Sequence, residues 1–131
     1  MPLQIERRPG HILVHGSGLA SLADAQRHFR ELSSLLVAER RTTRGVRLLI
    51  DLRAATPHPP EVASHIERVL PVLYRARDRV AVVVRDSTRK HETKRSHDPS
   101  YTDVFLTLAA AEAYLGQAHT HPCSLDSPAV A

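Results

Sequence analysis

The spacing of apolar residues in the N-terminal third of the chain predicts a hairpin followed by an amphipathic helix. Two short extended runs, residues 3–6 and 12–15, flank Pro9-Gly10, and a Pro-Gly turn between such runs is typical of an antiparallel hairpin. From residue 22 to about residue 40, apolar side chains recur every three or four positions, as on a helix with one buried face. The expected buried face consists of Leu22, Ala25, Phe29, Leu32 and Leu36, whereas Arg27, Arg30, Glu31, Glu39 and Arg40 are expected to face mostly outward.

Two later runs are short and almost continuously apolar, which is the pattern of strands buried on both faces. They span residues 46–52 and 79–85, and the first is expected to be the central strand. Residues 60–73 between them carry an apolar stripe, with Pro60 suited to the first helical turn. Pro71 lies inside this helix, where we expect a kink or a break. A strand, a helix and a strand in this order predict a parallel pair joined by a right-handed crossover.

The C-terminal third predicts one more strand between two helices. Residues 87–102 are polar and suit a short surface helix. A short strand is expected at residues 104–106, followed by a helix over residues 108–115. Thr107 is placed to cap this last helix, and Gly116 is placed to end it.

The chain is expected to form one α/β domain. Its 131 residues are too few for two independent cores, and its shares of hydrophobic (42%) and charged (24%) residues are ordinary for a globular protein. The domain should span residues 1–116, with a mixed sheet of about five strands and helices packed on it, in the order ββαβαβ(α)βα. Residues 117–131 show little periodicity and are expected to be a disordered tail.

This order of elements resembles the STAS fold, which is named for sulfate transporters and anti-sigma-factor antagonists. The apolar patterns of residues 48–53, 80–83, 104–105 and 112–115 are similar to those of its SpoIIAA-like branch, also described as STAS/SEC14-like. The resemblance covers roughly residues 3–116. It implies a non-enzymatic binding or regulatory module, and the SEC14 likeness implies a carrier of a small apolar or anionic ligand.

One feature of anti-sigma-factor antagonists has no counterpart in this chain. There, a phosphorylatable Ser in an Asp-Ser-Ser-Gly-like motif starts the helix after the central strand. The matching stretch is Thr56-Pro57-His58-Pro59-Pro60-Glu61, which contains neither Ser nor Gly. Thr56 stands nearest to that role, but Pro57 would change how a kinase docks. We therefore do not expect the phosphorylation switch.

The formal net charge of +4 raises the question of nucleic-acid binding. Basic residues gather in two segments, 40–50 and 85–97. In the expected fold the first leads into the amino end of the central strand and the second leaves the carboxyl end of its neighbour, so they lie at opposite edges of the sheet. Neither segment contains an aromatic residue, and phosphate binding needs its cations on one face. The pattern argues against nucleic-acid binding.

Motifs of enzyme or metal chemistry are incomplete. The run from His91 begins like the zinc-protease motif HExxH, but Arg95 stands where the second His must be. His91 and His97 are expected to be exposed to solvent. Two other histidines, His28 and His65, fall on predicted helices and are expected to be exposed or packed at the edge of the core. The sequence predicts no enzyme, no cofactor and no functional metal site.

The tail carries the single cysteine, Cys123, so an internal disulfide is excluded and a reducing compartment is the default. The run from His119 to Cys123 has metal-compatible side chains, but a flexible tail is expected to bind metal only adventitiously. The N-terminus has no apolar signal sequence, and no apolar run approaches the length of a membrane helix. These features predict a cytoplasmic protein without membrane insertion.

Polar side chains follow the two buried strands at their carboxyl ends, where ligands of open α/β sheets tend to bind. Arg53 and Arg85 could hold an anion or an acidic side chain there. The plainer alternative is that neighbouring aspartates pair with these arginines at the surface. The residues at this edge are Asp51, Arg53, Thr56, His58, Arg85 and Asp86.

Two hypotheses for function follow. The first is a regulatory module that recognises an unknown protein partner through the loop and helix after the central strand. Its expected contact residues are Arg53, Thr56, His58, Arg85 and Asp86. The second is the carrier of a small ligand, and an enlarged apolar pocket between the sheet and the helices would favour it. A homodimer through the free edge of the hairpin also remains open.

Overall fold

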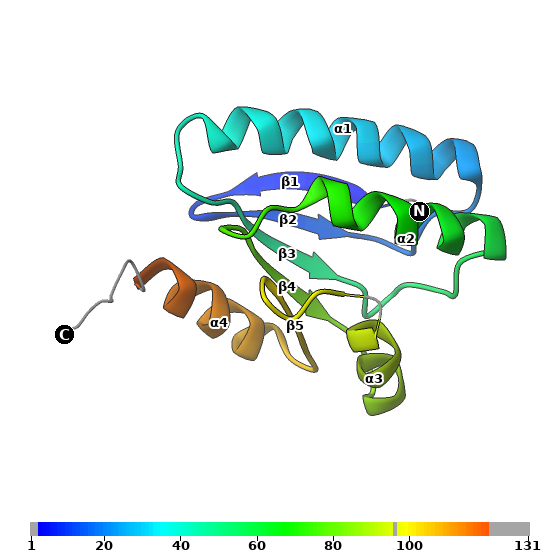
Figure 1. Ribbon diagram of the computed structural model, residues 1–131. Coiled ribbons are helices and arrows are strands. Elements are labelled where there is room, and N and C mark those ends of the chain that lie inside the picture. Colours follow the sequence, from blue (N-terminus) through cyan, green and yellow to red (C-terminus); the bar gives the residue numbers. More distant parts are fainter. Residues whose placement is uncertain (1–2, 96, 121–131) are drawn as a thin grey trace.

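The computed structural model describes residues 3–95 and 97–120, and its helices and strands follow the expected order (Figure 1). The strands are β1 (Gln4–Arg8), β2 (His11–His15), β3 (Arg47–Asp51), β4 (Arg79–Val83) and β5 (Thr102–Phe105). The helices are α1 (Leu22–Arg40), α2 (Pro60–Leu73), α3 (Ser87–Arg95) and α4 (Leu108–Thr120). The prediction of a mixed α/β sheet in the order ββαβαβ(α)βα is confirmed.

The strands lie in the sheet in the order of the sequence, from β1 at one edge to β5 at the other. β1 and β2 form an antiparallel hairpin, and β2, β3, β4 and β5 are parallel. Gly10 in the hairpin turn has a φ of 86°, which glycine adopts without steric cost. Both the hairpin and the parallel pair of β3 and β4 are as predicted.

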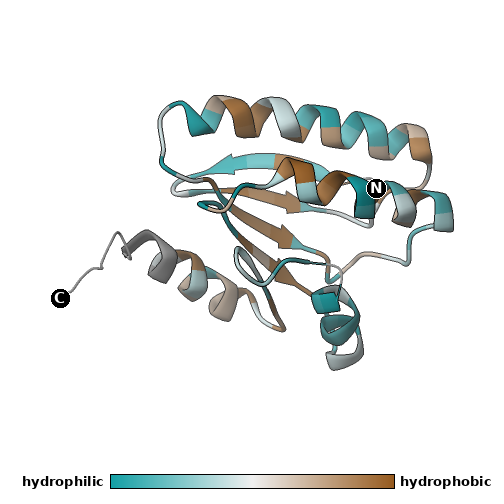
Figure 2. Cartoon of the chain, viewed as in Figure 1, coloured by the Kyte–Doolittle hydropathy of each residue, from teal (hydrophilic) through white to brown (hydrophobic). Residues whose placement is uncertain are grey.

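Helices cover both faces of the sheet (Figure 1). α1 and α2 lie side by side over one face, and α4 packs on the other face against β3, β4 and β5. Leu48 of β3 therefore packs beneath α1 and α2, while the next residue, Leu49, packs beneath α4. Figure 2 shows the apolar character concentrated in the middle strands. Burial on both faces explains why these runs are continuous in the sequence.

The buried face of α1 agrees with the prediction except at its start. Ser21 caps the helix, because its Oγ accepts a hydrogen bond from the Asp24 amide at 3.1 Å. Leu22, at the first helical position, is 37% exposed and does not belong to the buried face. His28 does belong to it, and this histidine is buried with Ala25, Leu32 and Leu36.

A buried aspartate joins three segments at the amino end of β4. Asp78 is 1% exposed, and its carboxylate accepts hydrogen bonds from the amides of Val46 (3.0 Å) and Arg75 (2.9 Å). The guanidinium of Arg40 forms an ion pair with the same carboxylate and donates to the Leu73 carbonyl at 2.9 Å. The prediction that Arg40 faces outward is wrong, because the buried charge of Asp78 holds the end of α1 against the core.

Two helices continue through residues that were expected to break or end them. α2 begins with Pro60, as predicted, and continues past Pro71 to Leu73 without a break. Pro71 lies in the last turn, where its missing N–H removes little from the helix. α4 continues past Gly116 to Thr120, because Gly116 lacks the positive φ that commonly ends helices. Residues 121–131, the greater part of the predicted tail, lie outside the described residues.

Candidate functional site

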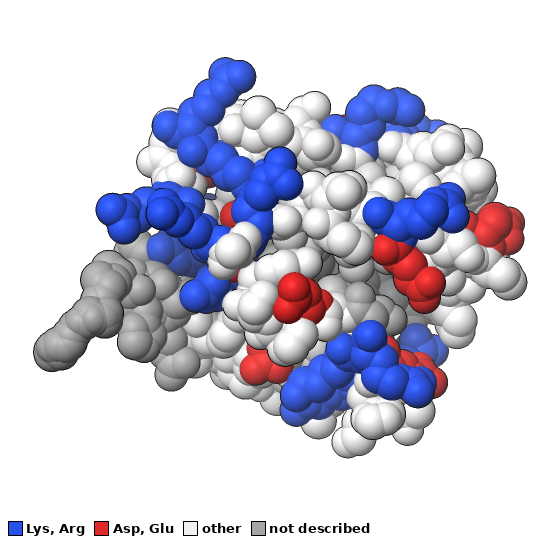
Figure 3. Space-filling model, in the orientation of Figure 1, with Lys and Arg blue, Asp and Glu red and all other residues white. Residues whose placement is uncertain are grey.

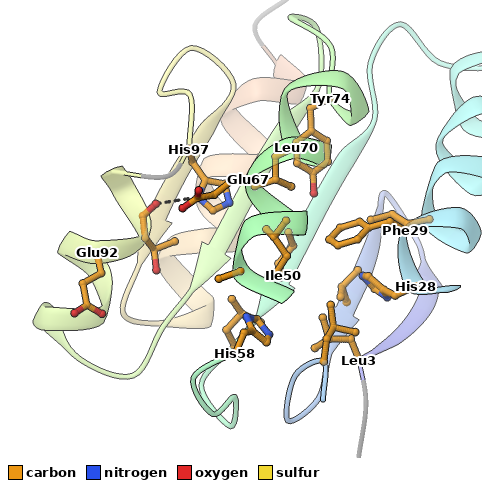
Figure 4. A pocket seen from close by; sticks show the side chains of 17 residues that line it. Leu3, His28, Phe29, Ile50, His58, Glu67, Leu70, Tyr74, Glu92 and His97 are labelled. Carbon is orange, nitrogen blue, oxygen red and sulfur yellow. Dashed lines mark hydrogen bonds between the residues drawn. The ribbon is translucent and has the colours of Figure 1, made fainter. Parts of the chain in front are cut away.

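A cavity of about 350 Å³ lies between the sheet and the two helices α1 and α2 (Figure 4). Its walls are mostly apolar and come from the start of the chain, β2, β3, α1 and α2. Ala63 on α2 has the smallest side chain of this lining. The larger apolar residues of the wall include Leu3, Phe29, Leu32, Ile50, Ile66 and Leu70.

Three histidines from three different segments line the same cavity. His28 comes from α1, His58 from the loop before α2, and His97 from the segment after α3. His97 Nδ1 lies 2.9 Å from the Thr93 carbonyl oxygen, so this ring has a partner within the protein. His28 and His58 have none among the described residues, and one nitrogen of each, His28 Nδ1 and His58 Nε2, is fully covered by neighbouring atoms.

The environment keeps these imidazoles uncharged at neutral pH. His28 is 6% exposed, and burial lowers its pKa to about 4. Burial also lowers the pKa of His58 and of His97, although for His97 the Thr93 carbonyl acts in the opposite direction. A neutral imidazole can both donate and accept a hydrogen bond. The cavity therefore contains hydrogen-bonding groups without a net positive charge.

Tyr74 supplies a hydroxyl group to the cavity. Its side chain comes from the residue after α2, its ring packs edge-on against Tyr101 at 5.8 Å, and the residue is 4% exposed. Figure 4 shows the hydroxyl pointing into the cavity, beside Leu70 and Phe29. Within the described part of the chain this hydroxyl has no hydrogen-bond partner. Burial, with smaller effects from Tyr101 and Asp78, raises its pKa, so the group remains a protonated donor.

The charged residues of the cavity are acidic. Glu67 on α2 and Glu92 on α3 line it and are exposed, so they lie at its margin. Among the described residues that form the wall there is no Lys or Arg. A carboxylate or phosphate group in this cavity would lose its water without gaining a cation in exchange. The site suits an uncharged or positively charged guest better than an anion.

Comparisons with known proteins show the fold. No protein-family model and no curated protein matches the chain. Among solved structures, it is similar to an uncharacterised DUF3478-family protein from Shewanella loihica PV-4, which is described as having a SpoIIAA-like fold. The TM-score is 0.66, with 18% sequence identity, and the match covers 86% of this chain and 91% of that one. This chain has a SpoIIAA-like fold.

Most of the predicted site residues lie at the carboxyl edge of the SpoIIAA-like sheet and not in the cavity. Arg53 binds Asp51 through two hydrogen bonds of 2.9 and 2.8 Å, which lowers the pKa of Asp51 and raises that of Arg53. Asp86 accepts a hydrogen bond from the Arg89 amide at 2.8 Å, so it caps the start of α3. Arg85 is exposed. For Asp51 and Arg53, the surface pair considered as the plainer alternative is the arrangement present.

The stretch that corresponds to the phosphorylation motif of anti-sigma-factor antagonists divides between the surface and the cavity. Thr56 is exposed, and its amide donates to the Ser17 carbonyl at 2.9 Å. His58 packs against Gly18, where an added Cβ would lie 3.2 Å from the imidazole Nε2. Gly18 has a φ of 117°, so it is suited to this loop both by its conformation and by the closeness of the ring. Of the five predicted contact residues, only His58 reaches the cavity.

The sequence reasoning missed His28, Tyr74 and His97. A signal for His28 was present, because it lies three residues after Ala25 and four before Leu32, within the buried stripe of α1. Tyr74 follows the last apolar residue of α2, where a buried hydroxyl has no sequence signature. The expectation that His97 is exposed is wrong, because the segment after α3 folds against the cavity wall. His91 is exposed, as predicted.

The two basic segments remain apart, as the topology required. The arginines of the first segment lie before β3 or at its first residue, and the second segment begins just after β4 ends, at the opposite edge of the sheet. Figure 3 shows the Lys and Arg side chains on this face in separate groups. Over the described ranges no set of His, Cys, Asp and Glu side chains is arranged to hold a metal, and no helix there has the length and apolar character to cross a membrane. Cys123 and His121 lie outside the described residues.

Proposed function

We infer that this protein is a non-enzymatic binding module that takes a small, largely apolar molecule into the cavity beneath α1 and α2. The observation that carries this conclusion is the cavity itself, with its volume of about 350 Å³ and its mostly apolar wall. Ligand sites in proteins are typically concave spaces of ~300–1,000 Å³ with apolar walls and a few polar groups. The cavity has this composition, and it lies between the sheet and the helices.

The volume limits the size of the guest. A cavity of ~150 Å³ lined by apolar side chains can bind benzene, which has six non-hydrogen atoms. By the same ratio, the space here suits a molecule of about 12–14 such atoms. Each buried methylene group of such a guest contributes ~0.8 kcal/mol. A guest of this size can therefore bind through burial alone, with the polar groups of the wall selecting among candidates.

Native mass spectrometry of freshly purified protein tests the proposal, with a bound mass of up to a few hundred daltons as the expected result. Naphthalene serves as a defined apolar probe, and since the chain contains no Trp its fluorescence can be followed without tryptophan emission. The variant Ala63→Phe, which fills the cavity from α2, should lose both the bound mass and the probe. Its neighbour Ser64 is exposed on the same helix, so Ser64→Phe is the matched control and should retain both. Equal binding by the two variants would overturn the proposal.

Recognition of a protein partner through the loop and helix after β3 is the second candidate. The exposure of Arg53, Thr56 and Arg85 at the carboxyl edge favours it. A partner that binds there should be lost from an Arg53→Ala/Arg85→Ala double variant. Arg30→Ala, on the exposed side of α1, is the control and should retain the partner. Retention by the double variant would exclude this edge as the contact surface.

A further inference from the structure

The polar groups of the cavity limit which ligands it can bind, in addition to its preference for apolar molecules. Tyr74 and His28 are each more than nine-tenths buried and line the cavity. Neither side chain has a hydrogen-bond partner among the described residues. Buried polar groups in folded proteins are usually hydrogen-bonded, so an unpaired one calls for an explanation. A ligand in the cavity can supply a partner to the Tyr74 hydroxyl and to the uncovered nitrogen of His28, although it does not reach the covered His28 Nδ1.

The geometry of the two side chains determines which atoms are available. His28 Nδ1 is covered by its surroundings, which leaves Nε2 as the nitrogen that meets the cavity. The Tyr74 hydroxyl points into the space from the opposite part of the wall (Figure 4). The hydroxyl donates, and the neutral imidazole donates or accepts according to its tautomer. Each of these groups matches the oxygen of an alcohol, a phenol or a carbonyl group.

The charges at the margin of the cavity disfavour an anionic ligand. Glu67 and Glu92 would repel a carboxylate, and the wall contains no Lys or Arg to neutralise one among the described residues. We propose that the cavity selects an uncharged molecule of about 12–14 non-hydrogen atoms that carries a hydroxyl or carbonyl oxygen, which Tyr74 and His28 bind. This proposal rests on the proposed function, because it specifies the guest of the same cavity.

Three probes with one apolar body separate the possibilities. Naphthalene has no polar group, 2-naphthol adds an uncharged hydroxyl, and 2-naphthoate adds a carboxylate. A neutral hydrogen bond changes affinity by ~2- to 10-fold. We expect Tyr74→Phe, which removes only the hydroxyl, to lower the affinity for 2-naphthol by that factor and to leave naphthalene unchanged. The wild type should bind 2-naphthoate more weakly than 2-naphthol.

Tyr101→Phe is the matched control, because Tyr101 is buried against Tyr74 but does not line the cavity. It should leave the affinity ratio of 2-naphthol to naphthalene at the wild-type value. His28→Leu should reduce that ratio as Tyr74→Phe does, and comparing ratios cancels the different solubilities of the probes. If Tyr74→Phe and His28→Leu both retain the wild-type ratio, or if 2-naphthoate binds tightest, this inference is wrong while the proposed function stands. If none of the probes binds, both are wrong.

Discussion

Buried polar groups beneath α1 and α2 differ in whether they have hydrogen-bond partners. At the amino end of β4, Asp78 is almost completely buried, and its carboxylate accepts hydrogen bonds from two backbone amides in addition to its ion pair with Arg40. In the cavity, His28 and Tyr74 are buried to a similar degree, and their side chains have no hydrogen-bond partner among the described residues. Burial alone does not distinguish the two regions, but pairing does.

The difference separates a group that connects three segments of the fold from groups that line the cavity without hydrogen-bond partners. A fully paired buried carboxylate fixes the segments that bind it, and removing it leaves each of their donors unpaired. The unpaired polar atoms of His28 and Tyr74 hold no other segment and carry a desolvation cost, although the rings themselves pack in the protein interior. Substitution of the paired carboxylate should therefore destabilise the fold more than substitution of the unpaired groups.

The largest expected effect is at Asp78. Asp78→Ala leaves the Arg40 guanidinium and the amides of Val46 and Arg75 without their partner, so the free energy of unfolding should fall by ~3–5 kcal/mol. Urea denaturation followed by circular dichroism measures this loss. Asp24→Ala is the control, because the Asp24 carboxylate forms an ion pair with the exposed Arg27 and with no other described residue, and it should cost less than ~1 kcal/mol. Equal losses of unfolding free energy in the two variants would show that the buried contacts of Asp78 do not stabilise the fold.

The next effect depends on pH and concerns His28. Its folded pKa of about 4 lies below the ordinary 6.5, so between these values the unfolded chain binds a proton that the folded chain does not. The free energy of unfolding should therefore fall as pH decreases from 6.5 to 4, by up to ~1.4 kcal/mol per pH unit from this group, and the loss should level off below 4. Urea midpoints measured between pH 7.5 and 5 report the slope.

His28→Leu should reduce this slope while changing stability little at pH 7.5. The slope will not vanish, because burial also lowers the pKa of His58, His97 and His11. His91→Leu replaces an exposed histidine on α3 and should leave the slope as in the wild type. A slope that is the same in all three proteins would contradict the assignment of His28 as a neutral buried group.

A third prediction compares a larger side chain placed before β3 with a larger side chain placed in the cavity. Gly45 precedes β3, and a Cβ at this position would lie 2.0 Å from the carbonyl oxygen of Arg77, so the backbone would have to move. Gly45→Ala should cost ~1–3 kcal/mol in urea denaturation. Ala63→Leu adds three carbon atoms facing the cavity and should change stability by less than ~1 kcal/mol. A larger loss for Ala63→Leu than for Gly45→Ala would mean that the cavity has no room.

The fold could be predicted because its signals are local. Val80 to Val83 are apolar without interruption, which is the pattern of a short strand covered on both faces. The inward turn of Arg40 could not be predicted, because its partner Asp78 lies 38 residues away and becomes buried only when β4 joins the sheet. The prediction that Gly116 ends the last helix was wrong, because a glycine ends a helix by adopting a positive φ, and the sequence does not show φ.

The candidate site was harder to predict, because a cavity is a space that several elements leave unfilled. No single segment encodes it: His28, His58 and Tyr74 are separated by 30 and 16 positions in the sequence. The residues at the carboxyl edge were predicted instead, because charged residues that follow a strand can be recognised in a sequence. Of these, Arg53 proved to be paired with its own neighbour, Asp51. Only His58 belonged to both the predicted edge and the cavity.

The smallest expected effect is at this edge, and it tests the contrast between paired groups in different surroundings. Arg53 and Asp51 form a pair as well aligned as that of Arg40 and Asp78, but the Arg53 side chain is 44% exposed, whereas the Asp78 side chain is 2% exposed. Water competes for exposed charges, so Arg53→Ala should cost less than ~1 kcal/mol and the loss should shrink further in high salt. Arg40→Ala, measured by the same urea denaturation, should cost several times more because it strands the buried Asp78 carboxylate. Similar losses for the two variants would show that burial does not decide how much each ion pair stabilises the fold.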